Sequence, residues 1–160
     1  MNGRPTRIAN LKKQLAERIL VLDGAMGTAI QNRDLTAADF GGADLEGCNE
    51  NLILTRPDVI SDIMKMYLDA GADILETNTF GATPLVLTEY NLSDKAYEIN
   101  FESARIAREL ADQYTTEKKP RFVAGCMGPT TKAISVTGGV TFDELIENYY
   151  FQAKALYEGG

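Results

Sequence analysis

A unit of strand, helix, glycine turn and strand constrains this fold more than any other feature of the sequence. Apolar residues 19–22 predict a first strand, which follows a short amphipathic helix over residues 8–18. A second helix is predicted to begin near Pro57, capped by Thr55 and Asp58, and to end at Gly71 before a strand at residues 73–77. Such a unit indicates a right-handed crossover and a parallel sheet.

The same unit then recurs. A short helix over residues 82–90 and a long helix over residues 93–114 lead to a third strand at residues 121–125. Thr141 and Glu144 predict the start of a last helix, which buries Leu145, Ile146, Tyr149, Ala153 and Leu156 and ends at Gly159. Residues 32–51 are expected to form a long loop.

Three strand–helix units fit either a doubly wound α/β sheet or the first part of a (β/α)8 TIM barrel. No strand is followed by the Gly-x-Gly-x-x-Gly fingerprint or by a P-loop, so the barrel is favoured.

Charge and composition exclude several classes of partner. The 160 residues carry a net charge of -7 and no basic cluster beyond residues 118–121, which argues against nucleic acid and against an anionic membrane. No apolar run approaches the ~20 residues of a membrane helix, and residues 1–7 lack the apolar core of a signal peptide. A cytoplasmic location is therefore expected.

Three segments just after the strands carry the candidate chemistry, because ligands bind at the carboxyl ends of parallel strands. These segments are residues 23–28, 76–81 and 125–130, all polar or rich in glycine. They are expected to converge on one pocket.

Each candidate residue in these segments has two interpretations. Asp23 either pairs with a cation such as a substrate ammonium or is capped by backbone amides. Gly24 and Gly27 either let amides face an anion or form a turn that needs positive φ. Asn78 and Thr79 either bind a polar substrate or order their loop.

The sequence offers few metal ligands. Histidine is absent, and Cys48 and Cys126 are the only two cysteines. Because a catalytic zinc site uses three protein ligands, free thiols are favoured over a metal site here.

Three ordered motifs resemble the homocysteine S-methyltransferase family, and within it the N-terminal homocysteine-binding domain of cobalamin-dependent methionine synthases. They are residues 18–28 (RILVLDGAMGT), 70–80 (AGADILETNTF) and 122–130 (FVAGCMGPT). Shorter matches at residues 51–57 and 98–101 extend the resemblance over nearly the whole chain.

The resemblance implies a (β/α)8 barrel of which residues 1–160 supply about the first three units, ending before the strands that carry the zinc ligands. In the family, zinc held by three cysteine thiolates activates the sulfur of homocysteine. That sulfur takes a methyl group from methylcobalamin, ultimately from methyltetrahydrofolate, to give methionine. The substrate-binding positions implied here are Asp23, Gly24, Ala25, Thr28, Asn78 and Thr79.

One departure from the family pattern concerns the cysteines. Cys48 and Cys126 match no zinc ligand, so neither a metal ligand nor a catalytic residue is expected within the chain, and the fragment is expected to be inactive alone. The partners expected are homocysteine, the remaining barrel strands, and cobalamin and folate domains.

Alternatives stay open for the methyl donor and for the class of function. A second departure is the loop at residues 133–140, which is shorter than expected in the cobalamin-dependent enzymes and leaves S-methylmethionine or another methyl donor as an alternative. A different class of function, a binding or assembly module that pairs through open barrel edges, also fits. The strand ends carry no lysine, which counts against a Schiff-base lyase or aldolase.

Overall fold

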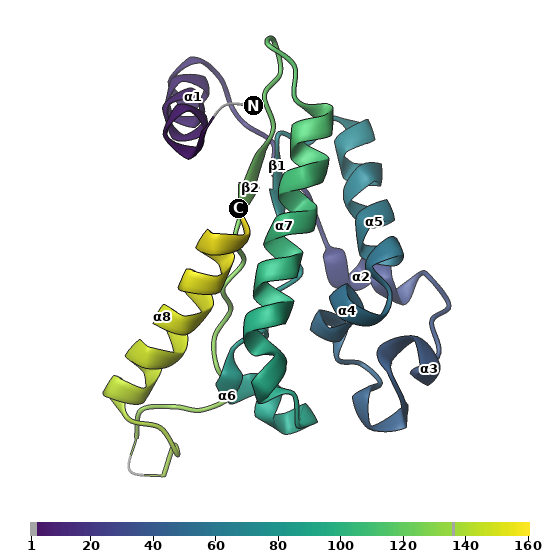
Figure 1. Ribbon diagram of the computed structural model, residues 1–160, viewed down its shortest axis with the longest axis vertical. Helices are drawn as coiled ribbons and strands as arrows, with labels where there is room; N and C mark the ends of the chain where they lie inside the picture. The colour runs from purple at the N-terminus through teal and green to yellow at the C-terminus, as the bar shows by residue number, and fades with distance from the viewer. Residues whose placement is uncertain (1–2, 136) are drawn as a thin grey trace.

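The computed structural model describes residues 3–135 and 137–160 and has an α/β architecture rich in helix, with a small parallel sheet (Figure 1). The elements, in chain order, are α1 (Arg4–Glu17), α2 (Met26–Gln31), α3 (Ala37–Phe40), η1 (Ala43–Leu45), η2 (Asn49–Asn51), α4 (Leu52–Thr55), α5 (Pro57–Ala70), β1 (Ile74–Glu76), α6 (Pro84–Leu87), η3 (Thr88–Tyr90), η4 (Ser93–Lys95), α7 (Ala96–Tyr114), β2 (Phe122–Ala124) and α8 (Phe142–Gly159).

The sheet confirms the predicted parallel arrangement. β1 and β2 pair in parallel, with Leu75 opposite Val123 in the centre of the register. Residues 21–23 lie on the other side of β1 through a parallel bridge between Leu22 and Ile74. The backbone N–H of Asp23 donates to the carbonyl of Ile74 at 2.9 Å. Spatial order therefore follows chain order across the three segments.

The first predicted strand is shorter than expected. Only the Leu22 bridge forms, and Ile19 is 89% exposed while Val21 is also exposed. An extended segment that pairs on one edge and has no layer over one face gains little from burial, so regular pairing stops after the bridge.

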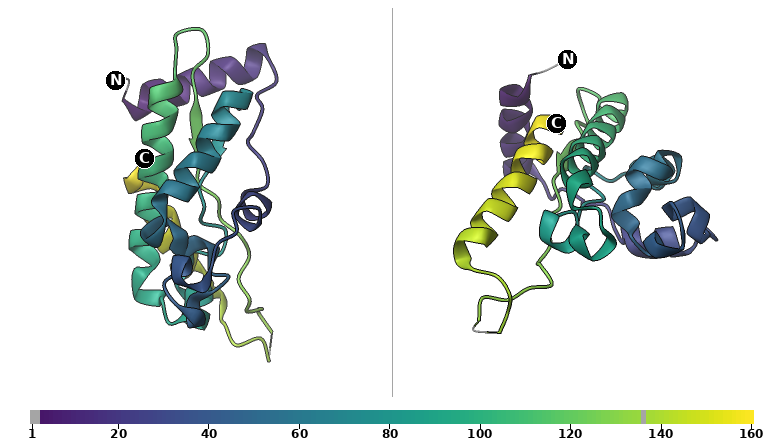
Figure 2. Two further views of the ribbon diagram at one scale, coloured as in Figure 1. Left: turned by 90° about the vertical axis from the view of Figure 1, so that its right-hand side faces the viewer. Right: turned by 60° about the horizontal axis from the view of Figure 1, so that its bottom comes forward.

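The helices form one layer beside the strands. α7 lies between α5 and α8, whereas α1 stands apart from this layer (Figures 1 and 2). α5 ends at Gly71 with a left-handed φ of 107°, as predicted. The main core lies under α4, α5 and α7; its large, fully buried side chains include Leu52, Ile60, Ile63, Met64, Leu75, Leu87 and Ile99.

Other predictions need correction. Residues 32–51 are not a plain loop, because a capping box of Thr36 and Asp39 starts α3. Thr55 does not cap α5: it ends α4, and Arg56 takes the cap position and pairs with Asp58.

The two terminal helices also differ from expectation in what they bury. Thr141 and Glu144 form the predicted capping box of α8, and Leu156 is buried as predicted. However, Ile146 and Ala153 are exposed, and the buried face also carries Asn148 and Gln152. α1 buries no residue, and its contact with α8 is made by Arg4, which lies 3.6 Å from the ring centre of Tyr157. None of the helices in the described ranges combines the length and apolar character of a bilayer-spanning segment.

A buried carboxylate joins the segments at the amino-terminal end of the sheet. Arg18 donates to both oxygens of Asp73, at 2.8 and 2.9 Å, and the backbone N–H of Val21 donates to Oδ2 at 2.9 Å. The guanidinium of Arg121, at the start of β2, lies 3.6 Å from Oδ1. The hydrogen bonds from Arg18 lower the pKa of Asp73 more than its burial raises it.

Replacing the Asp73 carboxylate should destabilise the amino-terminal end of the sheet. We expect Asp73→Asn to lower the free energy of unfolding by on the order of 3 kcal/mol, because Arg18 and the buried Arg121 lose their counter-charge. Since the folded pKa is lowered, the stabilisation is present above pH ~3.9 and is lost as pH falls through the folded pKa. Urea unfolding measures both effects.

Asp69→Asn is the matched control, because Asp69 is an exposed carboxylate that accepts one hydrogen bond, from Tyr114. Its effect should stay within about 0.5 kcal/mol. Equal losses in the two variants would contradict the role assigned to Asp73.

Candidate functional site

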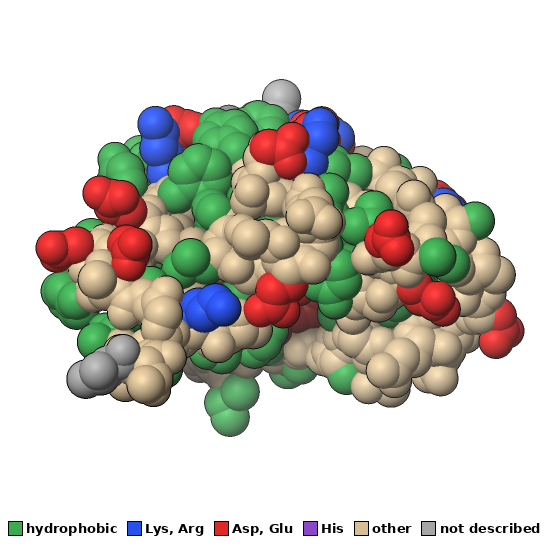
Figure 3. Space-filling view, turned by 90° about the horizontal axis from the view of Figure 1, so that it is seen from below, with side chains coloured by type: hydrophobic (Ala, Val, Ile, Leu, Met, Phe, Trp, Pro, Cys, Tyr) green, Lys and Arg blue, Asp and Glu red, His purple; other side chains and the backbone are tan. Residues whose placement is uncertain are grey.

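A cavity of about 540 Å³ lies where residues 23–27 and the ends of β1 and β2 come together. All three predicted segments therefore contribute to one pocket. Its lining residues are Asp23, Gly24, Ala25, Met26, Gly27, Asn49, Glu50, Glu76, Thr77, Asn78, Thr79, Phe80 and Cys126. Acidic side chains are distributed over the face seen from below, one of them at a recess near its middle (Figure 3).

Asp23 is held at the sheet and buried, with 9% of its surface exposed. Its Oδ1 accepts a hydrogen bond from the backbone N–H of Glu76 at 3.0 Å. Burial, aided by the nearby charge of Glu76, raises the pKa of Asp23 to about 6. No Lys or Arg of the described residues pairs with it, so of the two interpretations the structure supports capping by a backbone amide and supplies no protein cation.

Two further carboxylates line the cavity. Glu50 Oε1 accepts a hydrogen bond from the backbone N–H of Gly81 at 2.7 Å, and a Cβ at Gly81 would lie 2.9 Å from that oxygen. Glu76, at the end of β1, is half-buried. With Asp23 they make the cavity an anionic surface that suits a cationic group.

Backbone amides follow the Asp23 carboxylate. Within the described residues, the N–H groups of residues 24–28 donate to no protein acceptor, so they are available to an anion. Gly24 and Gly27 do not adopt positive φ, so the interpretation that a left-handed turn requires them is wrong. The unpaired N–H groups carry partial positive charge and the Asp23 carboxylate is negative, so one short segment presents both signs of charge.

Thr28 lies apart from the other predicted site residues. It lines a neighbouring hollow of about 220 Å³ with Asn32 and Met66, and the cavity around Asp23 does not include it. Ala25 lines both.

Asn78 and Thr79 line the cavity, but their side chains are engaged within the protein. Asn78 Nδ2 donates to the carbonyl of Asn49 at 2.7 Å. Thr79 Oγ1 donates to the carbonyl of Cys126 at 2.7 Å and lies 2.6 Å from Thr77 Oγ1. These bonds support the loop-ordering interpretation of both residues.

Several lining residues were not among the predicted site positions. Glu50 and Asn49 come from the segment that was expected to be a loop, and no strand end marks them in the sequence. Glu76 and Cys126 lie in the segments predicted to form the pocket, so their place at the ends of predicted strands could have identified them as lining residues.

Neither cysteine forms a disulfide; Cys48 is buried and Cys126 is half-buried. Burial raises the pKa of Cys48 to about 11, and burial together with the charges of Glu76 and Asp23 raises the pKa of Cys126. Metals bind thiolates, which these environments disfavour. The part of the chain that the structure describes holds no group of three or more His, Cys, Asp or Glu side chains placed for a metal, so a zinc ion does not fit these residues.

Comparison with known proteins gives two findings. The family model described as homocysteine S-methyltransferase matches residues 20–160. Among solved structures, the metallated homocysteine methyltransferase MmuM from Escherichia coli superposes with a TM-score of 0.73 at 23% identity, over 95% of this chain and 53% of that chain.

The oxidised form of MmuM gives a TM-score of 0.73 at 22% identity, over 94% of this chain and 53% of that chain. The chain thus spans about half the length of these structures, and at this identity the likeness shows a shared fold.

The raised pKa of Asp23 predicts a stability penalty that a neutral residue removes. Because the folded pKa is about 6 and the unfolded pKa ~3.9, the folded state binds more protons between these values, and stability falls as pH rises through this window. Asp23→Asn should therefore be more stable at pH 7, by up to about 3 kcal/mol, with a flatter pH profile. Urea unfolding from pH 4 to 7 measures this.

Asp62→Asn serves as the control, because Asp62 is an exposed carboxylate on α5. It should leave both stability and the pH profile close to those of the original chain. A steep loss of stability in Asp23→Asn at pH 7 would show that the carboxylate stabilises the fold.

Proposed function

The chain belongs to the homocysteine S-methyltransferase family, and on that premise we propose that its cavity holds the amino-acid end of homocysteine during methylation to methionine. The observation that carries this proposal is the Asp23 carboxylate, which is buried without a protein cation beside the free amides of residues 24–27. A zwitterionic amino acid has the complementary pair of charges.

Each end of the substrate has a stated partner in this proposal. The ammonium lies against Asp23, where a carboxylate of low solvent exposure binds a cation more strongly than one in water. The carboxylate accepts hydrogen bonds from the backbone N–H groups of Gly24 and Ala25. Asn78 and Thr79 shape the wall of the cavity, and Glu50 and Glu76 add to its negative potential.

The architecture proposed for the whole domain is a (β/α)8 barrel, with residues 1–160 as its N-terminal part. Spatial order follows chain order across residues 21–23, β1 and β2, and α5 and α7 pack on the strands, which supports a barrel wall. The exposed Ile19 and Val21 are surfaces that further barrel elements would cover.

Sulfur activation is proposed to lie outside the described residues. The homocysteine thiol, with a pKa near the ~8.5 of a free thiol, is mostly protonated at neutral pH. The described residues supply neither a metal cage nor a cation at the cavity to lower that pKa. The methyl donor is proposed to be methylcobalamin, as the resemblance implies, with S-methylmethionine as the alternative.

Binding of homocysteine to the 160-residue chain tests the proposal. We expect isothermal titration calorimetry under reducing conditions to show binding that Asp23→Asn weakens about 10- to 100-fold, the range for a lost charge-assisted hydrogen bond. The affinity should also fall below pH ~6, because Asp23 is then protonated.

Two analogues make the test specific to each end. 4-Mercaptobutanoate lacks the ammonium, so its affinity should be low and insensitive to Asp23→Asn. 3-Mercaptopropylamine lacks the carboxylate and should still depend on Asp23. Asp62→Asn is again the control, and equal homocysteine affinity in the Asp23 and Asp62 variants would contradict the proposal.

Metal content and turnover test the second half of the proposal. We expect elemental analysis of the purified chain to find zinc far below one ion per chain. Burial, and for Cys126 the nearby carboxylates, raise the pKa of both thiols, so neither offers the thiolate that zinc binds. With methylcobalamin or S-methylmethionine as donor, the chain alone should form no methionine. One tightly held zinc per chain, or turnover, would overturn this part.

A further inference from the structure

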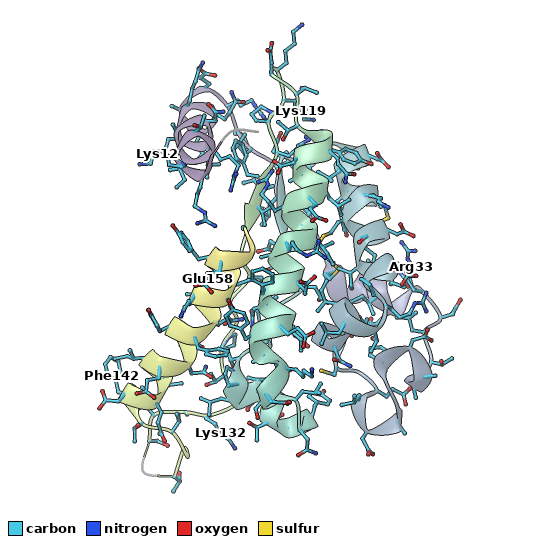
Figure 4. All side chains as sticks on the ribbon, in the orientation of Figure 1. Lys12, Arg33, Lys119, Lys132, Phe142 and Glu158 are labelled. Carbon is cyan, nitrogen blue, oxygen red and sulfur yellow. The ribbon has the colours of Figure 1, made fainter. Side chains whose placement is uncertain are left out.

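A buried network of amide side chains connects α7 and α8 to the wall of the cavity. We define the cavity loop as residues 77–82, which follow β1 and include the lining residues Thr77 to Phe80. Asn100 from α7 and Gln152 from α8 are completely buried behind this loop. The two helices run side by side, with side chains filling the space between them (Figure 4).

The acceptors in this network determine how both amides are oriented. Asn100 Nδ2 donates to two carbonyls, those of Ala82 at 2.6 Å and Ala96 at 2.7 Å. Its Oδ1 is thereby turned toward Gln152, whose Nε2 donates to it at 3.2 Å and to the carbonyl of Thr79 at 2.8 Å. Because the carbonyls of Ala82, Ala96 and Thr79 can only accept, neither amide can be reversed without losing its bonds.

The cavity loop passes this restraint on to the third strand end. Thr79 Oγ1 donates to the carbonyl of Cys126, and Thr77 Oγ1 accepts from the backbone N–H of Cys126 at 2.8 Å. The N–H of Asn78 donates to Ser103 of α7 at 2.9 Å. A displacement of Thr79 would therefore move two walls of the cavity together.

We propose that Gln152 is a positioning residue for the ligand cavity, which acts by holding the main chain of Thr79. Its Oε1 is buried with no partner among the described residues, so this amide is a poor choice for stability alone. An apolar side chain of the same length would fill the space without an unpaired oxygen, but it would leave the Thr79 carbonyl and Asn100 Oδ1 without a donor. The Nε2 group is what such a side chain lacks, and both of its bonds lead to the cavity loop or its support.

The test compares two buried amides on the same helix. Gln152→Met keeps the length of the side chain and removes the donor. Asn148→Leu is the matched control, because Asn148 is also buried on α8 and has one unpaired atom, yet its Oδ1 accepts from Leu85 of α6 and not from the cavity loop. Each variant is made in the full 160-residue chain.

Three measurements are made on both variants. We expect Gln152→Met to weaken homocysteine affinity about tenfold, which corresponds to one lost hydrogen bond. Its melting temperature should fall by a few degrees, because the buried Thr79 carbonyl and Asn100 Oδ1 lose their donor. The amides of Gly81 and Gly128 should exchange faster with solvent, because the loop that holds them is released. Asn148→Leu should leave affinity and these exchange rates unchanged.

The affinity readout rests on the proposed function, whereas the exchange readout does not. If the original chain fails to bind homocysteine, the proposed function fails and the exchange rates alone decide the role of Gln152. Unchanged exchange of Gly81 and Gly128 in Gln152→Met, or a loss of affinity that the control shares, would overturn the inference. If Gln152→Met does not fold, Gln152→Asn, which retracts the amide by one methylene, takes its place with the same expected outcome.

Discussion

The ion pair cluster around Asp73 is the interaction on which the rest of the structure depends. One buried carboxylate, just before β1, binds Arg18 and the backbone of Val21 in one segment of the chain and the guanidinium of Arg121 in another. It thereby aligns residues 21–23 and β2 on either side of β1. Without that alignment the segments after the strands would not meet, and the cavity would have no walls.

The two ends of the sheet treat carboxylates in opposite ways. Asp73 has arginine partners and a lowered pKa, so its charge stabilises the fold. Asp23 has a single backbone donor and a raised pKa, so its charge is costly until a cation arrives. This contrast separates a structural carboxylate from one available to a ligand. The segment that carries Asp23 is held beside β1 by the hydrogen bond from the N–H of Asp23 to the carbonyl of Ile74.

Local patterns predicted much of the fold. The proline at the start of α5, the left-handed Gly71 at its end, and the capping box at Thr141 act within one helical turn, so the sequence reports them directly. Only part of the face that α8 buries could be predicted in this way, since Leu156 is buried as predicted and Ile146 is not. Apolar periodicity favoured Ile146, whereas α8 turns Asn148 and Gln152 inward because the N–H of Leu85 in α6 and the carbonyl of Thr79 meet them. Hydrogen bonding across the fold outweighed apolar burial there.

The candidate site also has features that local sequence predicts and features that depend on the tertiary structure. The sequence by itself determined that Asp23, the amides after it, and residues 76–79 and 126 lie at strand ends, because the alternation of strands and helices places such residues together. It also determined the absence of histidine and the shortage of thiols. Only the tertiary structure decided that Glu50 joins the cavity, that Thr28 does not, and that Asn78 and Thr79 use their side chains within the protein. Those outcomes depend on contacts between residues far apart in the chain, and no local pattern records which donor will meet which acceptor.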